Sequence, residues 1–168
     1  KVAEAAKNKV HIAKSKSGIL VKGIDDVAVR FSRCCNPVPG DEIVGFVTRG
    51  RGISIHRTDC INMLNLPEDE RSRLIDAEWQ KAETDSASAT YSTEIKVYAN
   101  NRIGLFVDIS KVFTERQIDI TSINVRTSKQ GKATITMAFD IHGVEELNRL
   151  TEKIRQIDSV LDIERATG

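Results

Sequence analysis

The sequence has few aromatic residues, histidines and cysteines, and it lacks a long apolar run. Aromatic residues make up 5% of the 168 positions, and there are three histidines and three cysteines. No stretch approaches the ~20 apolar residues that a membrane-spanning helix needs, and the charged start, Lys1 to Lys7, is unlike a signal peptide. An odd number of cysteines, two of them adjacent, does not suggest a disulfide framework. These absences predict a cytoplasmic protein with reduced thiols and no membrane partner.

Recognisable catalytic motifs are missing as well. The chain has no phosphate-binding glycine-rich loop of the Walker type. It also has no Ser/His/Asp order and no paired-carboxylate cluster. Its histidines, His11, His56 and His142, lie far apart in sequence. We therefore predict no catalytic residues and no enzymatic activity for this chain itself.

Charge is distributed unevenly along a chain whose formal net charge is +1. Residues 1–60 hold 11 lysines and arginines against 6 acidic residues, residues 61–90 hold 3 against 7, and residues 91–168 hold 11 of each. The basic first segment could contact nucleic-acid phosphates, because lysine and arginine release the condensed counterions there. A basic surface that is simply solvated is the alternative interpretation, and charge alone favours it.

Composition and hydrophobic period divide the chain into four segments. Residues 1–14 are rich in alanine and lysine and read as the tail of an upstream helical region, so we expect the chain to be a fragment. Residues 15–80 carry short strand-like runs around all three cysteines and are expected to form a small α/β domain. Residues 81–90 are small and polar, which is typical of a linker. Residues 91–168 are expected to form a second domain.

The second domain follows the order βαββαβ, the ferredoxin-like arrangement with both helices on one face of the sheet. We expect a strand at 91–99, a helix at 105–113, a strand at 118–125 with a bulge near Thr121–Ser122, a turn at Gln130–Gly131, a strand at 133–141, a helix at 147–154 and a strand from 161. The predicted fold class of the whole chain is therefore α+β. RNA-recognition motifs share this order, but the strand at 133–141 lacks the exposed aromatic residues that such motifs stack on bases.

A set of metal-ligand side chains gathers in the first domain. Thiolates and imidazole are ligands that zinc prefers, and four of them complete a tetrahedron. A domain of this size with few large apolar side chains often depends on a structural metal. The candidate zinc ligands are Cys34, Cys35, His56 and Cys60.

Spacing leaves other interpretations of these residues open. The adjacent cysteines reach one ion only if the backbone turns there, which the nearby Pro37 and Pro39 favour. His56 and Cys60 would share a face if a helix begins near Thr58. Free cysteines are also often small buried hydrophobic residues, and the adjacent pair could instead act as a redox switch. Spacing alone does not separate these interpretations.

The same segment resembles a known family. Its first part, Cys34 to Gly45, reads Cys-Cys-x-Pro-x-Pro-Gly-Asp-x-Ile-x-Gly, and its second part, Gly50 to Cys60, reads Gly-x-Gly-Ile-x-x-His-x-x-x-Cys. Both parts resemble the cysteine-rich module near the C-terminus of long bacterial RelA/SpoT-type (p)ppGpp synthetase/hydrolases. The resemblance implies a zinc-finger or ribosome-intersubunit domain followed by an ACT domain, with the four residues above as the ligand set.

The resemblance also implies a function. The synthetase and hydrolase domains would lie outside this chain, and the parent protein would be a GTP pyrophosphokinase or (p)ppGpp hydrolase that acts in the stringent response. Through the parent protein, the chain would contact the ribosome, its rRNA and bound tRNA. The candidate contacts to rRNA phosphates are Lys14, Lys16, Lys22, Arg30, Arg33, Arg49, Arg51 and Arg57.

The first turn of the second domain carries another resemblance. Residues Asn101 to Ile109 are similar to the ACT-domain signature polar-x-x-Gly-Leu-x-x-Asp-Ile, although the family usually has an aspartate where this chain has Asn101. ACT domains often dimerise and bind an amino acid at the interface, so the resemblance implies a homodimer and a branched-chain amino acid as ligand. Glycine lets a ligand approach the backbone closely, and free amides at a helix start favour a carboxylate. The expected ligand-binding residues are Asn101, Arg102, Ile103, Gly104 and Leu105.

Two alternatives stay open for the second domain. Gly104 could serve only to let helix and sheet pack closely, without any ligand, because a fold by itself does not imply a function. The chain could also be a stand-alone amino-acid-binding ACT regulatory protein, or a redox-switch module, instead of part of a larger enzyme.

Overall fold

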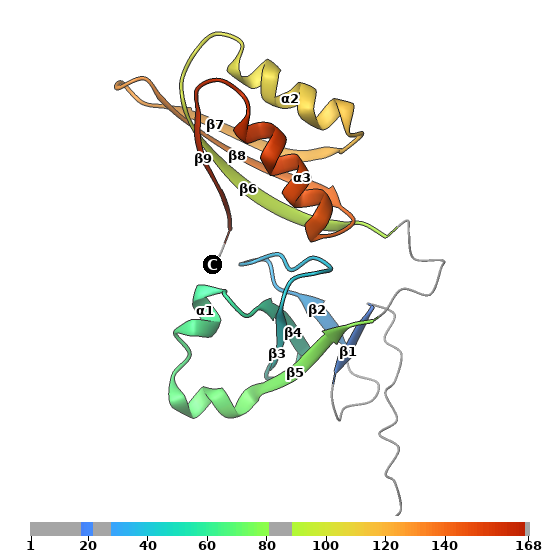
Figure 1. Cartoon of the computed structure of the whole chain (residues 1–168). Helices are drawn as coiled ribbons and strands as arrows, with labels where there is room; N and C mark the ends of the chain where they lie inside the picture. The colour runs from blue at the N-terminus through green and yellow to red at the C-terminus, as the bar shows by residue number, and fades with distance from the viewer. Residues whose placement is uncertain (1–17, 22–27, 81–88, 167–168) are drawn as a thin grey trace, which may run out of the picture.

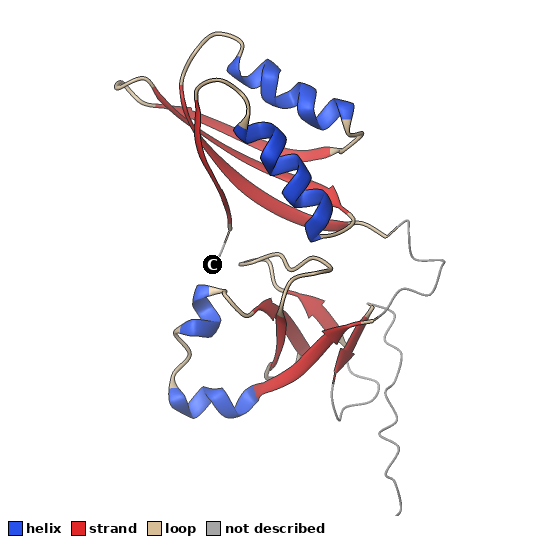
Figure 2. Cartoon of the chain, in the orientation of Figure 1, coloured by secondary structure: helices blue, strands red, loops and turns tan. Residues whose placement is uncertain are grey.

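The computed structural model describes residues 18–21, 28–80 and 89–166, which build two separate β-sheets (Figure 1). In the first, cysteine-rich domain, short strands lie beside two brief helical segments (Figure 2). The second, which we call the βαββαβ domain, has longer strands and two full helices. The predicted helical tail at 1–14 and most of the predicted linker at 81–90 lie outside the described residues. Across the described ranges, no helix has the length and apolar character needed to cross a membrane.

The cysteine-rich domain has a five-stranded sheet in the order β1-β5-β3-β4-β2. Its small core is centred on four buried side chains, Ile19, Ile53, Ile55 and Ala77. Neighbouring strands are antiparallel except β2 and β4, which are parallel. The elements are β1 (Ile19–Val21), β2 (Val29–Phe31), β3 (Ile43–Val47), β4 (Ile53–Arg57), α1 (Ile61–Leu64), the 3-10 helix η1 (Glu68–Arg73) and β5 (Leu74–Trp79).

The parallel pairing of β2 and β4 brings the candidate metal ligands to one edge of this sheet. Phe31, which ends β2, is paired with Ile55 near the end of β4. Because parallel strands end at the same edge, the residues that follow β2 arrive beside the last residues of β4. At the opposite edge, where β2 and β4 begin, Gly52 allows the backbone before β4 to approach the backbone before β2 closely. Its φ is +76°, and a Cβ there would lie 2.1 Å from the carbonyl oxygen of Ala28.

The βαββαβ domain confirms the predicted α+β class and the ferredoxin-like order. The sheet order is β7-β8-β6-β9, and α2 and α3 cover one face of it (Figure 1). The core lies between sheet and helices, where Phe113 and Phe139 pack edge to face with ring centroids 5.0 Å apart. The elements are β6 (Tyr91–Asn100), α2 (Leu105–Glu115), β7 (Ile120–Thr127), β8 (Lys132–Ile141), α3 (Val144–Arg155) and β9 (Val160–Arg165).

Local details of this domain also agree with the sequence pattern. The pairing of β7 with β8 shifts between Ile120 and Ser122, which is the bulge expected from the slip in alternation. As a result, Ile120 and Ile123 oppose Phe139 and Met137, so both lie on the helix-covered side of the sheet. The turn between β7 and β8 includes residues 130 and 131, as predicted.

One predicted element begins later than expected. The short helix α1 starts at Ile61, with Cys60 as its N-cap, and not near Thr58. The amide of Thr58 donates to the carbonyl of Glu42 (3.0 Å), which prolongs the pairing of β3 with β4. The amide of Cys60 then donates to the carbonyl of Arg57 (3.1 Å) and closes a turn. Strand and turn, and not a shared helix face, therefore bring Cys60 back toward the end of β4.

Candidate metal centre

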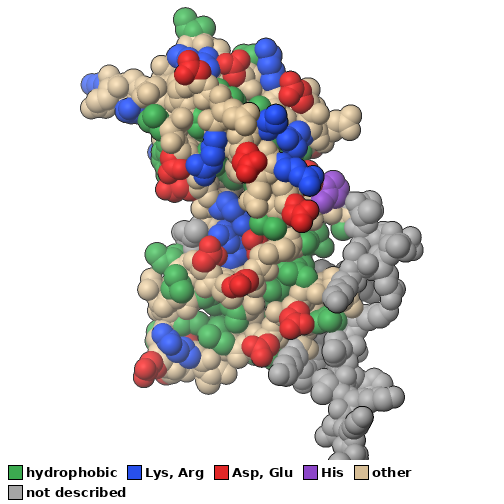
Figure 3. All heavy atoms as spheres, in the orientation of Figure 1, with side chains coloured by type: hydrophobic (Ala, Val, Ile, Leu, Met, Phe, Trp, Pro, Cys, Tyr) green, Lys and Arg blue, Asp and Glu red, His purple; other side chains and the backbone are tan. Residues whose placement is uncertain are grey.

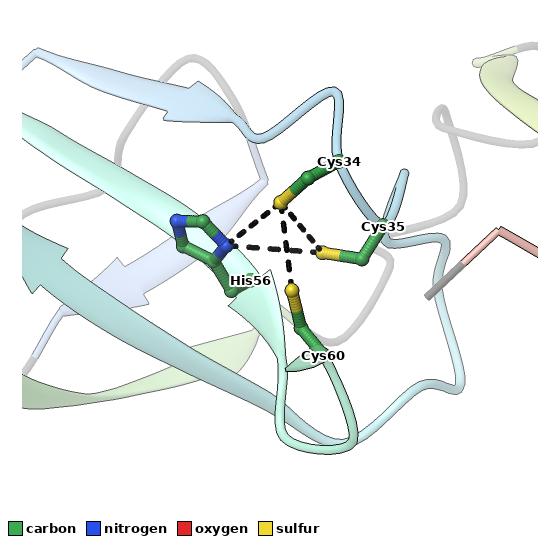
Figure 4. A group of neighbouring side chains, drawn as sticks. All are labelled: Cys34, Cys35, His56 and Cys60. Carbon is green, nitrogen blue, oxygen red and sulfur yellow. Dashed lines mark hydrogen bonds between the residues drawn. The ribbon is translucent and has the colours of Figure 1, made fainter. Parts of the chain in front are cut away.

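Four side chains converge at the shared end of β2 and β4 (Figure 4). The ligand atoms of all four lie within 4.8 Å of one another. The sulfur of Cys34 lies 3.5 Å from that of Cys60, 3.9 Å from that of Cys35 and 3.3 Å from Nδ1 of His56. With metal–sulfur bonds of about 2.3 Å, two sulfurs on one tetrahedron lie about 3.8 Å apart. The set thus has the size of a tetrahedral metal site.

A tight turn after β2 allows two adjacent cysteines to face the same point. The amide of Asn36 donates to the carbonyl of Ser32 (3.0 Å), which folds residues 32–36 into one turn. Asn36 itself has a φ of +46°, a conformation that asparagine tolerates better than most residues. On an extended strand the two thiols would point to opposite faces. The turn predicted from the nearby prolines is present, and it lies just before them.

The imidazole of His56 is oriented by a partner on its own strand. Nδ1 faces the sulfurs, and Nε2 lies 3.0 Å from the hydroxyl of Ser54, two residues earlier on the same face of β4. With a metal on Nδ1, Nε2 would carry the proton and donate a hydrogen bond to this hydroxyl, which would fix the tautomer and the ring orientation. Ser54 is not among the residues predicted from the sequence, although strand alternation places it on the face of His56.

Burial and hydrogen bonding give the three thiols different acidities. Burial raises the pKa of Cys35 from 9.0 to about 12 and also raises the pKa of Cys60. At Cys34 burial acts in the same direction, but hydrogen bonds, first that of the Ser32 hydroxyl at 2.8 Å, outweigh it and lower the pKa. Desolvation lowers the pKa of His56 and thus favours the neutral imidazole, the form that binds metals.

The donor set is suited to a structural ion. Three sulfurs and one imidazole nitrogen fill all four positions of a tetrahedron, and no fifth side chain or open position is needed. The three cysteines form no disulfide. These four residues, which the sequence singled out, could therefore hold a metal ion between the end of β2, the end of β4 and the start of α1.

The described residues of the set predicted to contact rRNA come from three parts of the cysteine-rich domain: β2 with the turn after it, the turn between β3 and β4, and the end of β4. Arg49 and Arg51 flank Gly50 in the turn between β3 and β4, and both are exposed. Arg30 on β2 and Arg33 just after it are also exposed. The remaining lysines of that set, Lys14, Lys16 and Lys22, lie outside the described residues.

Arg57 does not belong with the predicted rRNA contacts, and this prediction is corrected. Its side chain is buried, with 6% of the residue exposed, and it points between the domains (Figure 3 shows basic side chains at the junction). The guanidinium forms an ion pair with Asp59 and donates to the carbonyls of Cys35 (3.4 Å) and Ala166 (3.1 Å). A cation held in this way is not available to an RNA phosphate. Its charge was visible in the sequence, but its contact with the carbonyl of Ala166, 109 positions away, was not.

The residues predicted to bind an amino acid lie at the turn before α2, where they have different surroundings. Asn101, Ile103 and Gly104 are exposed, and Gly104 has a φ of +81°. A Cβ on Gly104 would meet nothing closer than Nη1 of Arg102 at 3.8 Å, so this glycine is not required for close helix–sheet packing. The left-handed backbone is the reason for glycine here.

Two of the five predicted ligand residues have structural partners. Arg102 forms an ion pair with Asp108 (2.8 Å) and donates to the carbonyl of Asp158 (3.1 Å), which ties the turn to the loop before β9. The side chain of Leu105 is 3% exposed and belongs to the domain core, so the expectation that it contacts a ligand is corrected. Any ligand at this turn would face mainly Asn101, Ile103 and Gly104.

Comparison with protein-family models agrees with the division into two parts. Residues 19–80 match the RelA/SpoT RIS domain, and residues 87–165 match the ACT domain. The four candidate ligands lie in the first match, and the turn before α2 lies in the second.

Curated proteins and solved structures give further relatives. The chain is 38% identical over 157 residues to a GTP pyrophosphokinase of Escherichia coli (strain K12), covering 93% of this chain and 21% of that protein. It is 37% identical over 156 residues to a GTP pyrophosphokinase of Streptomyces coelicolor, covering 93% and 18%. The chain thus spans about a fifth of the length of the curated relatives it matches. The ACT domain from the GTP pyrophosphokinase of Chlorobium tepidum is similar over 46% of this chain and 99% of that chain, with 21% identity and a TM-score of 0.42.

Proposed function

This chain combines a RelA/SpoT RIS domain with an ACT domain, and we propose that it is a regulatory, non-catalytic part of a GTP pyrophosphokinase. Its RIS domain holds a structural zinc ion and docks on rRNA, and its ACT domain binds a branched-chain amino acid. The observation that carries the proposal is the convergence of four metal-ligand atoms within the matched RIS segment.

Zinc is the ion that suits this donor set, because it accepts thiolate and imidazole together in a closed tetrahedron. The RIS domain has few fully buried apolar side chains, so a bound ion contributes a large share of its stability. Structural zinc contributes on the order of 10 kcal/mol to the folding of small modules. The ion would supply no catalysis here, and its role is to fix the turn after β2 against β4.

Metal analysis of protein purified under reducing conditions tests this step. We expect about one zinc ion per chain, and we expect His56→Ala and Cys60→Ser to lose it. His142→Ala is the matched control, because this histidine is exposed and pairs with Glu146 outside the cluster. A metal-free protein whose thiols react readily with peroxide would instead support the redox-switch alternative.

Docking on rRNA is supported by the exposure of Arg30, Arg33, Arg49 and Arg51, the described members of the predicted set that remain after Arg57 is removed. Arginine pairs with phosphate through its planar fork, and each such pair releases condensed counterions. The logarithm of the affinity falls linearly with the logarithm of the salt concentration. For duplex nucleic acid, this slope becomes steeper by about 0.9 for each phosphate that is neutralised.

Binding to purified ribosomes, measured at several salt concentrations, tests the docking surface. We expect the double variant Arg49→Ala/Arg51→Ala to bind more weakly, with a salt slope smaller by about 0.9 for each phosphate that these arginines neutralise. Arg126→Ala/Arg149→Ala is the control, because both arginines are exposed but lie in the ACT domain. Equal affinities and slopes for the two double variants would remove this surface from the proposal.

Amino-acid binding is the second candidate function, and the turn before α2 favours it. Ile103 is fully exposed, and the positive-φ Gly104 leaves open surface beside it. An apolar side chain next to helix-start amides suits a branched-chain amino acid, whose carboxylate would accept from those amides.

Calorimetric titration with valine, isoleucine and leucine tests this binding directly. We expect Gly104→Ala to abolish the heat of binding, because a Cβ covers the open surface. Gly50→Ala is the control for the strain of a positive φ, since Gly50 has a φ of +86° and nothing within 4 Å, but lies in the RIS domain. A flat titration of the unmodified chain with all three amino acids would contradict the proposal.

The chemistry of (p)ppGpp synthesis and hydrolysis is assigned to regions of the parent protein outside this chain. The proposal predicts no pyrophosphate transfer from ATP to GTP and no hydrolysis of (p)ppGpp by the purified 168-residue chain. Nucleotide chromatography after incubation with each substrate measures both. Turnover that copurifies with the chain through every step would refute the assignment.

A further inference from the structure

The loop that follows the paired cysteines contacts the second domain directly. We call residues 36–41 the docking loop. It begins directly after Cys35, and its backbone and side chains contact α3 and β9 of the ACT domain. Two candidate metal ligands and several interdomain contacts therefore occupy one continuous stretch of chain.

The polar contacts of the docking loop centre on Arg165 at the end of β9. Its guanidinium donates to both carboxylate oxygens of Asp41, at 2.7 and 2.9 Å, and to the carbonyl of Asn36 at 3.3 Å. The side chains of Arg165 and Asp41 are only 17% and 8% exposed. A bidentate ion pair with this little exposure holds its partners in one geometry.

The apolar contacts of the loop are equally close. Val38 is fully buried, and it is part of the hydrophobic core of the ACT domain. The amide of Val144 donates to the carbonyl of Pro39 (2.8 Å). Glycines stand where the surfaces meet: a Cβ on Gly40 would lie 2.4 Å from Val144, and a Cβ on Gly143 would lie 3.0 Å from the carbonyl of Pro39.

A second connection starts from the other ligand strand. Arg57 lies directly after His56, and its amide donates to the sulfur of Cys35 (3.3 Å). Its guanidinium donates to the carbonyl of Cys35 and to that of Ala166, just beyond β9. This arginine therefore contacts a metal ligand and the ACT domain at once.

From these contacts we infer that the metal site is an interdomain clamp, in which metal binding and docking of the ACT domain are thermodynamically coupled. A bound ion fixes Cys34 and Cys35, and thereby fixes the start of the docking loop in the position that Arg165 and Val144 require. The inference rests on the proposed zinc site, but it concerns residues that are not ligands. Coupling between two sites is reciprocal, so weakening the docking contacts must weaken metal binding by the same factor.

Zinc affinity, measured by competition with a chelating dye, tests this reciprocity. We expect Arg165→Ala to lower the affinity by about tenfold, although Arg165 is not a metal ligand. Arg155→Ala is the matched control: this arginine pairs with Asp162 at 3.6 Å near the same strand, is half exposed and has no contact with the RIS domain among its described bonds. We expect the control to bind zinc as the unmodified chain does.

A second measurement works on the unmodified chain and does not depend on a variant that folds. Val144 is the first residue of α3, so its amide has no acceptor within the helix and is protected by Pro39. On removal of zinc, its hydrogen exchange is expected to accelerate by about tenfold or more, while the amide of Leu150 inside α3 stays protected.

The outcomes separate the inference from the proposal beneath it. A chain that binds no zinc contradicts the proposed metal function itself. Two results together would leave the metal site in place but contradict the clamp. The first is equal zinc affinity for the Arg165→Ala and Arg155→Ala variants. The second is an exchange rate of the Val144 amide that is the same with and without zinc.

Discussion

Cys34 and Cys35 are neighbours in sequence, yet their thiols have different surroundings. The Ser32 hydroxyl helps to favour the thiolate of Cys34, whereas Cys35 is almost completely buried and its pKa is raised to about 12. Cys60 is buried in the same way, and its pKa is also raised. At neutral pH the metal-free site therefore keeps protons on Cys35 and Cys60, and a metal must displace them.

Zinc binding is consequently expected to release protons and to weaken as the pH falls. Because the pKa values of Cys35 and Cys60 lie above 9.0, protons compete with the metal throughout the neutral range. The affinity should fall by about tenfold per pH unit for each proton displaced. Calorimetry in buffers of different ionisation enthalpy counts the protons, and an affinity independent of pH between about 6 and 8 would contradict this account.

Gly52 gives a second prediction at the scale of one residue. Gly52→Ala forces a Cβ to within 2.1 Å of the Ala28 carbonyl, whereas Gly50→Ala in the same turn has a similar φ and open space around it. Both variants carry the strain of a positive φ, so the difference between them isolates the clash. We expect Gly52→Ala to be less stable than Gly50→Ala by about 1–3 kcal/mol in urea unfolding of the zinc-loaded protein. Equal stabilities would show that the β2–β4 edge moves freely.

Among the helices and strands, regular patterns were predictable and short pairings were not. The alternation from Ala133 to Ile141 and the stripe of Leu147, Leu150 and Ile154 predicted β8 and α3, and all three residues of that stripe are buried. The strand β2 has only three residues. Its parallel pairing with β4 cannot be predicted from the local alternation of apolar residues. That pairing is a long-range contact, and it is what assembles the candidate site.

The core-facing side of α2 should carry most of the stabilisation that this helix provides. Phe113 is 1% exposed and packs edge to face on Phe139, whereas Phe106 on the same helix is 44% exposed. Phe113→Ala leaves a cavity and is expected to destabilise the protein by about 3–5 kcal/mol in urea unfolding, whereas Phe106→Ala should have a much smaller effect. Similar destabilisation by both variants would mean that α2 has another partner over Phe106.

For the whole molecule, the relation between the domains was beyond sequence-based prediction. Asp41 and Arg165 are 124 positions apart, and each could have been a solvated charge. Val38 lies between two prolines that suggested a turn, and yet it is buried in the core of the other domain. The four candidate ligands could be predicted because their chemistry is rare and close in sequence, whereas these contacts use common residue types at long range.

Three aromatic rings also join the domains and provide an optical probe of their docking. Trp79 is the chain's single tryptophan, and Tyr91 is the first residue of β6. The indole stacks on the ring of Phe31 and packs edge to face with the ring of Tyr91. The ring centroids are 5.6 Å apart in both pairs. Its indole nitrogen donates to the carbonyl of Asp41 in the docking loop (3.0 Å). Tyr91→Ala admits water to one side of the indole, so we expect its fluorescence emission to shift to longer wavelength. Tyr98→Ala, further along β6 and bonded to Glu164, should leave the spectrum unchanged, and identical spectra for both variants would mean that the rings do not report on docking.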